Sequence, residues 1–115
     1  SRCFGHVADV VTAVGFLADH PGAIGQVFNI GATEEITILE LARRVITLTG
    51  SPSEIHFIPY DQAYAPGFED MRRRVPSIEK IGRLTGYQPT YSLNQILESV
   101  ITYERSIQNA TEEYL

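Results

Sequence analysis

Apolar residues recur at helical spacing in several stretches of the chain. From Val7 to Asp19 they follow intervals of three and four residues, and Pro21 and Gly22 stand after this stretch as a stop signal. The stripe consists of Val7, Val10, Val11, Val14 and Leu17. The spacing predicts a helix with one apolar face.

Two capping boxes predict the starts of two further helices. In Thr37-Ile38-Leu39-Glu40 the threonine hydroxyl can accept from the Glu40 amide while the Glu40 side chain reaches back, and Gly50 closes this helix. Its expected buried face consists of Ile38, Leu41, Ala42, Val45, Ile46 and Leu48. Ser92-Leu93-Asn94-Gln95 has the same pattern and begins the final helix. Between them, Ser77 is expected to cap a short helix that ends at Gly86.

Two short β-rich runs alternate with these helices. They cover residues 25–32, with Val27-Phe28-Asn29-Ile30-Gly31 at the centre, and residues 54–59. Alternation of strands and helices favours parallel pairing, yet two short strands leave a parallel sheet without neighbours. The expected fold class is α/β, a small helix-rich domain with a few short strands, cut from a longer polypeptide.

Charge and composition exclude several classes. The 115 residues carry 9 Lys and Arg against 14 Asp and Glu, a net charge of −5, which leaves no global basic footprint for nucleic acid. No stretch has the roughly 18 apolar residues of a membrane span. Cys3, the only cysteine, excludes an internal disulfide, and the cytoplasm is the default compartment for a lone thiol.

Basic side chains concentrate in the longest aperiodic segment, Tyr60 to Pro76. Arg72, Arg73 and Arg74 stand side by side there. Guanidinium groups match phosphate oxygens bidentately and stay charged when desolvated. The spacing fits either a phosphate-binding loop or a solvated cluster with local salt bridges.

Catalytic templates are missing from the chain. There is no G-x-G-x-x-G turn, and Lys80, the only lysine, has no tyrosine four residues before it. His6, His20 and His56 lack the spacing of metal ligands. No catalytic, cofactor-binding or metal-binding residue is therefore expected on this chain alone.

Five short motifs follow one another along nearly the whole chain. They are R-x-F-x-x-V-x-D from Arg2 to Asp9, F-N-I-G from Phe28 to Gly31, T-I-L-E-L-A from Thr37 to Ala42, R-x-P-S-x-x-K from Arg74 to Lys80, and G-Y-Q-P from Gly86 to Pro89. In this order they resemble the C-terminal, substrate-binding part of extended short-chain dehydrogenase/reductases. These are the NAD-dependent epimerases, dehydratases and decarboxylases that act on nucleotide sugars.

The resemblance implies roles for two arginines. In that family the arginine of R-x-F and the arginine of R-x-P grip the diphosphate of the nucleotide sugar, and these positions are Arg2 and Arg74 here. The resemblance also implies that residues 1–110 form the substrate-binding part. Residues 111–115, at the end of the chain, are expected to be a frayed tail. NAD would bind mainly to the protein's own N-terminal Rossmann domain, which this chain does not contain. Ser77 replaces the family's aspartate and is interpreted only as a helix cap.

Two function classes stay open. The first is the nucleotide-sugar-binding portion of an epimerase, dehydratase or decarboxylase, not catalytic as an isolated fragment. The alternative is a stand-alone, non-catalytic ligand-binding or interaction module derived from that domain. The residues that separate the three reactions lie mostly upstream, and a homodimer through the final helix is a further open alternative.

Overall fold

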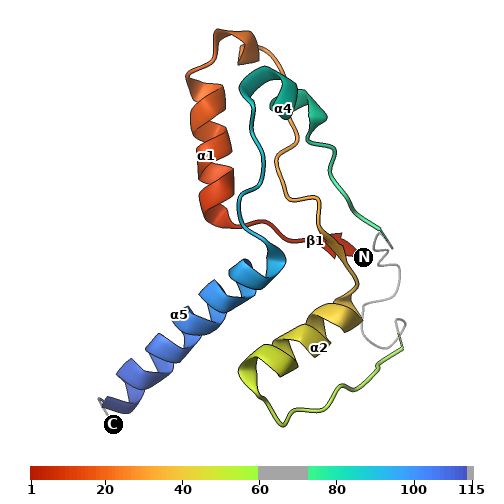
Figure 1. Ribbon diagram of the computed structural model, residues 1–115, viewed down its shortest axis with the longest axis vertical. Helices are drawn as coiled ribbons and strands as arrows, with labels where there is room; N and C mark the ends of the chain where they lie inside the picture. Colours follow the sequence, from red (N-terminus) through yellow and green to blue (C-terminus); the bar gives the residue numbers. More distant parts are fainter. Residues whose placement is uncertain (60–72, 114–115) are drawn as a thin grey trace.

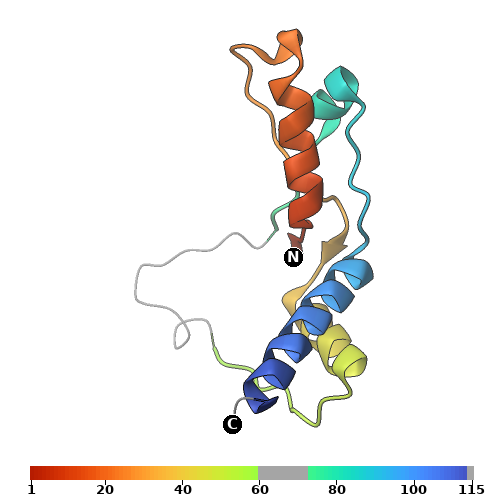
Figure 2. The same cartoon turned by 90° about the vertical axis from the view of Figure 1, so that its left-hand side faces the viewer.

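The computed structural model describes residues 1–59 and 73–113 of the chain. Its elements are β1 (Arg2–Cys3), α1 (Val7–Ala18), the 3₁₀ helix η1 (Pro21–Ala23), β2 (Glu35–Ile36), α2 (Ile38–Thr49), α4 (Glu79–Thr85) and α5 (Leu93–Glu113). Helices α1 and α4 lie at one end, and α2 and α5 at the other (Figures 1 and 2). The expected small helix-rich domain with a few short strands is confirmed.

The two groups of helices form an open molecule. Its radius of gyration is 18.2 Å, whereas a compact domain of this length would have one of about 13 Å. Segments without regular structure connect the groups (Figure 1). Helices α2 and α5 touch through hydrogen bonds from Arg44 to Asn94 and from Arg105 to the Thr49 carbonyl, each 3.3 Å.

A small core joins α1 to α4. Its fully buried members are Ala13 and Ile81, and Tyr87 is 3% exposed. Half-buried side chains packed against it are Leu17, Phe28, Ile30 and Ile78. Ala13 is the α1 residue in this core, so its side of α1 is the buried one.

The valine stripe of α1 lies mostly outside that core. Val7 is 70% exposed and Val11 65%, while the buried residues of the helix are Asp9 and Ala13. The helix itself is confirmed, but within the described chain its most apolar face has no cover. In α2, likewise, Ile38 is exposed although it was expected on the buried face.

Local capping predicted two helix starts correctly. The Glu40 amide donates to Thr37 Oγ1 at 3.2 Å, and Gly50 ends α2 in the left-handed region at φ +65°. In the second box both bonds form: the Gln95 amide donates to Ser92 Oγ at 3.2 Å and the Ser92 amide to Gln95 Oε1 at 2.8 Å. Helix α5 continues to Glu113, beyond residue 110.

The expected cap of α4 is wrong. Ile78, not Ser77, occupies the N-cap position, and no side chain bonds to the helix start. The end at Gly86, at φ +77°, is confirmed.

The predicted strands at residues 25–32 and 54–59 are also wrong, because neither segment forms a strand in the structure. A ladder needs a neighbouring backbone, and no described strand lies beside these segments. The strands that do form, β1 and β2, are antiparallel, with Arg2 opposite Ile36 and Cys3 opposite Glu35. Most of the predicted long loop, including Arg72, lies outside the described residues.

Candidate functional site

The two arginines singled out by sequence lie on segments that meet beside β1. The backbone amide of Arg74 donates to the Ser1 carbonyl at 3.1 Å. Nη1 of Arg2 donates to the same oxygen at 3.0 Å. Residues 72 positions apart in sequence therefore place two donors around one acceptor. Arg73, the other arginine of the triplet within the described residues, bonds to Glu35 instead.

Arg73 forms an ion pair with Glu35. Its Nε donates to Oε1 at 2.8 Å and its Nη2 to Oε2 at 3.2 Å, which is a bidentate arrangement. Ser1 Oγ donates to the same carboxylate at 2.5 Å. The hydrogen bonds from Arg73 and Ser1 lower the pKa of Glu35 to about 2, so the carboxylate stays ionised at neutral pH. Glu35 could not be selected from the sequence, because its partner Arg73 lies 38 residues away.

Arg74 also borders a pocket of about 480 Å³. The wall comes from β1, from residues 29–32 and from residues 74–76, and its polar members include Cys3, Asn29 and Arg74. Arg2 is not among the residues that line this pocket. The Arg2 guanidinium and the Arg74 backbone amide thus share the Ser1 carbonyl as their acceptor. Of the two arginines, Arg74 borders the pocket.

Gly31 fits tightly against the segment that carries Arg74. A Cβ at Gly31 would lie 3.0 Å from Cγ of Pro76. This close approach gives the F-N-I-G motif a physical role, because it seats Pro76 two residues after Arg74. A side chain at position 31 would have to move that segment.

Cys3 is unsuited to nucleophilic chemistry. Burial raises the pKa of the thiol above its ordinary value of 9.0, and the charge of Glu35 raises it further, against a smaller opposite effect of Arg73. The thiolate is the reactive form, so a raised pKa makes the side chain less reactive.

A buried carboxylate connects α1 to the start of α5. Asp9, 5% exposed, accepts from the Thr90 amide at 3.0 Å, from Thr90 Oγ1 at 2.6 Å and from the Tyr91 amide at 3.2 Å. His6 caps α1 by accepting from the Ala8 amide, and its ring stacks on Tyr91. These contacts give the aspartate of the first motif a structural role that the sequence did not indicate.

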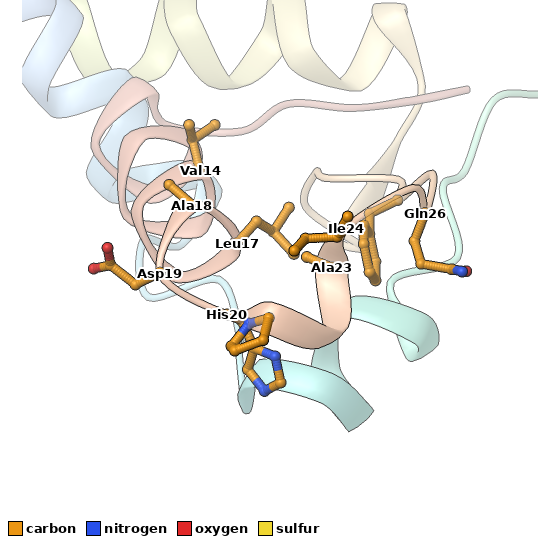
Figure 3. A pocket seen from close by; sticks show the side chains of 10 residues that line it. Val14, Leu17, Ala18, Asp19, His20, Ala23, Ile24 and Gln26 are labelled. Atoms are coloured by element: carbon orange, nitrogen blue, oxygen red, sulfur yellow. The ribbon is translucent and has the colours of Figure 1, made fainter.

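A second hollow, of about 540 Å³, lies at the end of α1 (Figure 3). Apolar side chains of α1 such as Val14 and Leu17 form its wall together with Ile24, while Asp19 points away from them. His20, at its rim, accepts from the Gly22 amide at 3.0 Å and serves as a helix cap. Among the described residues, no lysine or arginine lines this hollow.

Residues 1–59 and 73–113 were also compared with the requirements of a metal site and of a dinucleotide site. They contain no group of three or more His, Cys, Asp or Glu that could hold a metal ion. Their only sheet is the antiparallel β1–β2 pair, whereas a dinucleotide site needs a parallel sheet with a glycine-rich turn. The described residues therefore do not form a dinucleotide-binding fold of this type. None of their helices has the length and apolar character needed to cross a membrane.

No family model matches the chain. Curated relatives do. The chain is 34% identical over 109 residues to a UDP-N-acetyl-alpha-D-glucosaminuronate decarboxylase of Bacillus cytotoxicus, and 35% identical over 103 residues to UDP-glucuronic acid decarboxylase 1 of Danio rerio. These matches cover 95% and 90% of the chain but 34% and 23% of the relatives. A UDP-D-apiose/UDP-D-xylose synthase of Oryza sativa is 29% identical over 112 residues, 90% of the chain and 28% of the synthase.

A solved structure agrees with these relatives. A short-chain dehydrogenase/reductase superfamily protein from Agrobacterium tumefaciens, crystallised with bound NAD, matches 99% of the chain with a TM-score of 0.71 and 26% identity. The match covers 32% of that protein. The chain thus spans about a third or less of the length of the proteins it resembles. It is homologous to one part of the UDP-sugar decarboxylases and synthases of the extended short-chain dehydrogenase/reductase family.

Proposed function

We propose that this chain is the nucleotide-sugar-binding portion of an NAD-dependent enzyme that converts UDP-sugars. Arg2 and Arg74 hold the diphosphate, and the hydride chemistry belongs to NAD on another part of the polypeptide. The observation that carries the proposal is the convergence of the Arg2 guanidinium and the Arg74 backbone on the Ser1 carbonyl. Three relatives, each named as a UDP-sugar decarboxylase or synthase, support UDP as the nucleotide.

The proposed role has a simple energetic basis. Two arginines on segments far apart in sequence can fix both the position and the orientation of a diphosphate. Binding energy from this remote group then orients the sugar for reaction elsewhere. The chain as a whole has a net charge of −5, so the positive charge for the diphosphate would come from these two arginines and not from the overall charge.

We further propose that a dinucleotide-binding domain elsewhere in the same polypeptide covers the valine face of α1, which is formed by Val7, Val10, Val11 and Val14. Three observations support this partner: the exposure of Val7 and Val11, the unpaired segment 25–32, and the coverage of about a third of the matched relatives. Burying one valine side chain contributes about 1.5–3 kcal/mol. Several exposed valines on one helix therefore favour association with an apolar surface.

The binding role is tested by titrating UDP into the full polypeptide that the gene encodes. Arg74→Ala is expected to weaken UDP binding by tenfold or more, because a charge-assisted bidentate contact is lost. Arg43→Ala is the matched control: Arg43 is an exposed arginine of α2, 3.9 Å from Glu40. Equal affinities for the two variants would contradict the proposal and favour a stand-alone module without this site.

A further inference from the structure

We infer that Glu35 is a positioning residue that holds the two proposed diphosphate arginines in place. The inference rests on the proposed function, because it concerns the same site. The hydrogen-bond partners of Glu35 are not the two arginines themselves. It binds the residue before each of them: Ser1 through Oγ, and Arg73 through both guanidinium contacts.

The geometry makes Glu35 a link between separate segments. It lies on β2, opposite Cys3 in the ladder, so Ser1 and Glu35 project from the same face of the strand pair. One carboxylate oxygen, Oε1, accepts from both Ser1 and Arg73. The carboxylate thereby joins the start of β1 to residues 73–74, and the backbone bond from Arg74 to Ser1 completes the link.

This assignment divides the arginine triplet by role. Nε and Nη2 of Arg73 both bond to Glu35, so Arg73 is assigned here as a structural partner and not as a phosphate ligand. Arg74, one residue on, borders the pocket. An exposed ion pair ordinarily contributes little stability, and Arg73 is 72% exposed. The value of this pair would therefore lie in positioning the arginines and not in overall stability.

The test measures UDP affinity of the full polypeptide in variants of this pair. Glu35→Gln and Arg73→Gln are each expected to weaken UDP binding about tenfold, because a displaced guanidinium loses part of its bidentate contact with the diphosphate. Glu40→Gln is the control, since Glu40 also forms an exposed ion pair with an arginine, at 3.9 Å. It should leave the affinity unchanged.

A charge-swapped double variant separates positioning from a general structural role. Glu35→Arg combined with Arg73→Glu restores the ion pair with reversed polarity. The double variant should bind UDP several-fold more tightly than the Glu35→Arg single variant. A purely local loss of structure would give no such recovery.

Each outcome decides a different point. If Arg74→Ala weakens UDP binding while Glu35→Gln binds like the parent, the inference is overturned and the proposed function stands. If neither variant changes the affinity, the proposed function is wrong and the inference falls with it. Should Glu35→Gln fail to fold, Arg73→Gln decides, because unchanged affinity in that folded variant overturns the inference.

Discussion

A single buried carboxylate, Asp9, connects α1 to the start of α5. It receives three hydrogen bonds from Thr90 and Tyr91, and the His6 ring stacks against Tyr91 beside it. Hydrogen bonds to a charged group contribute about 1.5–3 kcal/mol each to stability. At the scale of one residue, this is the interaction whose loss should be easiest to measure.

Asp9→Asn should loosen this junction. The asparagine amide has one acceptor oxygen, and its NH₂ group would face donors of Thr90 or Tyr91 that now bond to the carboxylate. The free energy of local opening at these two residues should therefore fall by about 1.5–3 kcal/mol. Hydrogen exchange of these two amides in the full polypeptide would then speed up roughly tenfold to a hundredfold. Unchanged exchange rates would contradict the role given to Asp9. Asp19→Asn, which alters an exposed carboxylate at the end of α1, is the control.

The same carboxylate predicts a dependence on pH. Burial raises the pKa of Asp9, but the hydrogen bonds from Thr90 and Tyr91 outweigh burial, so the pKa lies below its ordinary value of 3.8. A lowered pKa means that the stabilisation is fully present above pH 3.8 and is lost as the pH falls through the folded-state value. The protection factor of the Thr90 amide, which compares its exchange with that of an unstructured amide at the same pH, should therefore fall only below pH 3.8. A fall already between pH 7 and 5 would exclude Asp9 as its cause.

Cys3 offers a second measurement at this scale. Because the charge of Glu35 raises the pKa of the thiol while Arg73 lowers it, Glu35→Gln should lower the pKa of Cys3. The pH profile of Cys3 alkylation, followed by mass spectrometry of its peptide, should shift to lower pH. A profile identical to that of the parent would show that Glu35 does not face Cys3 in solution.

At the scale of elements, the sequence predicted features that depend on neighbouring residues but not those that depend on distant ones. Helix starts at Thr37 and Ser92 were predictable because a capping box is closed by residues three positions apart. The strands were not, because pairing depends on a backbone far away in sequence, and the real β1–β2 pair joins residues more than 30 positions apart. The cap of α4 failed because Ser77 lies one position too early.

The candidate site divides in the same way. Arg2 and Arg74 could be selected from motifs, and the structure places their segments together. Glu35 could not, since one glutamate among 14 acidic residues carries no mark of a partner 38 positions away. The direction of the α1 buried face was also missed, because Ala13 and Asp9 give a weaker apolar signal than the valines beside them.

Gly31→Ala tests whether the F-N-I-G segment seats Arg74. The added Cβ would meet Pro76 Cγ at 3.0 Å, so residues 74–76 must shift or the fold must absorb about 1–3 kcal/mol of overpacking. Either result should weaken UDP binding or lower the melting temperature of the full polypeptide. Gly15→Ala, where a Cβ would meet nothing within 4 Å, is the control. Parent-like binding and melting of Gly31→Ala would contradict this role.

At the scale of the molecule, the open shape is the main feature. The radius of gyration is 18.2 Å, and Val7 and Val11 on α1 are exposed. If the rest of the polypeptide covers that face, a thiol at Val11→Cys should react with a maleimide much more slowly in the full polypeptide than one at Arg43→Cys. Equal rates would mean that the face is uncovered in solution.

The most direct test of the central claim is a crystal structure of the full polypeptide with UDP bound. The account predicts diphosphate oxygens within hydrogen-bonding distance of the guanidinium groups of Arg2 and Arg74, with Arg73 still paired to Glu35. A diphosphate bound away from β1 and residues 73–76, with neither arginine in contact, would contradict it.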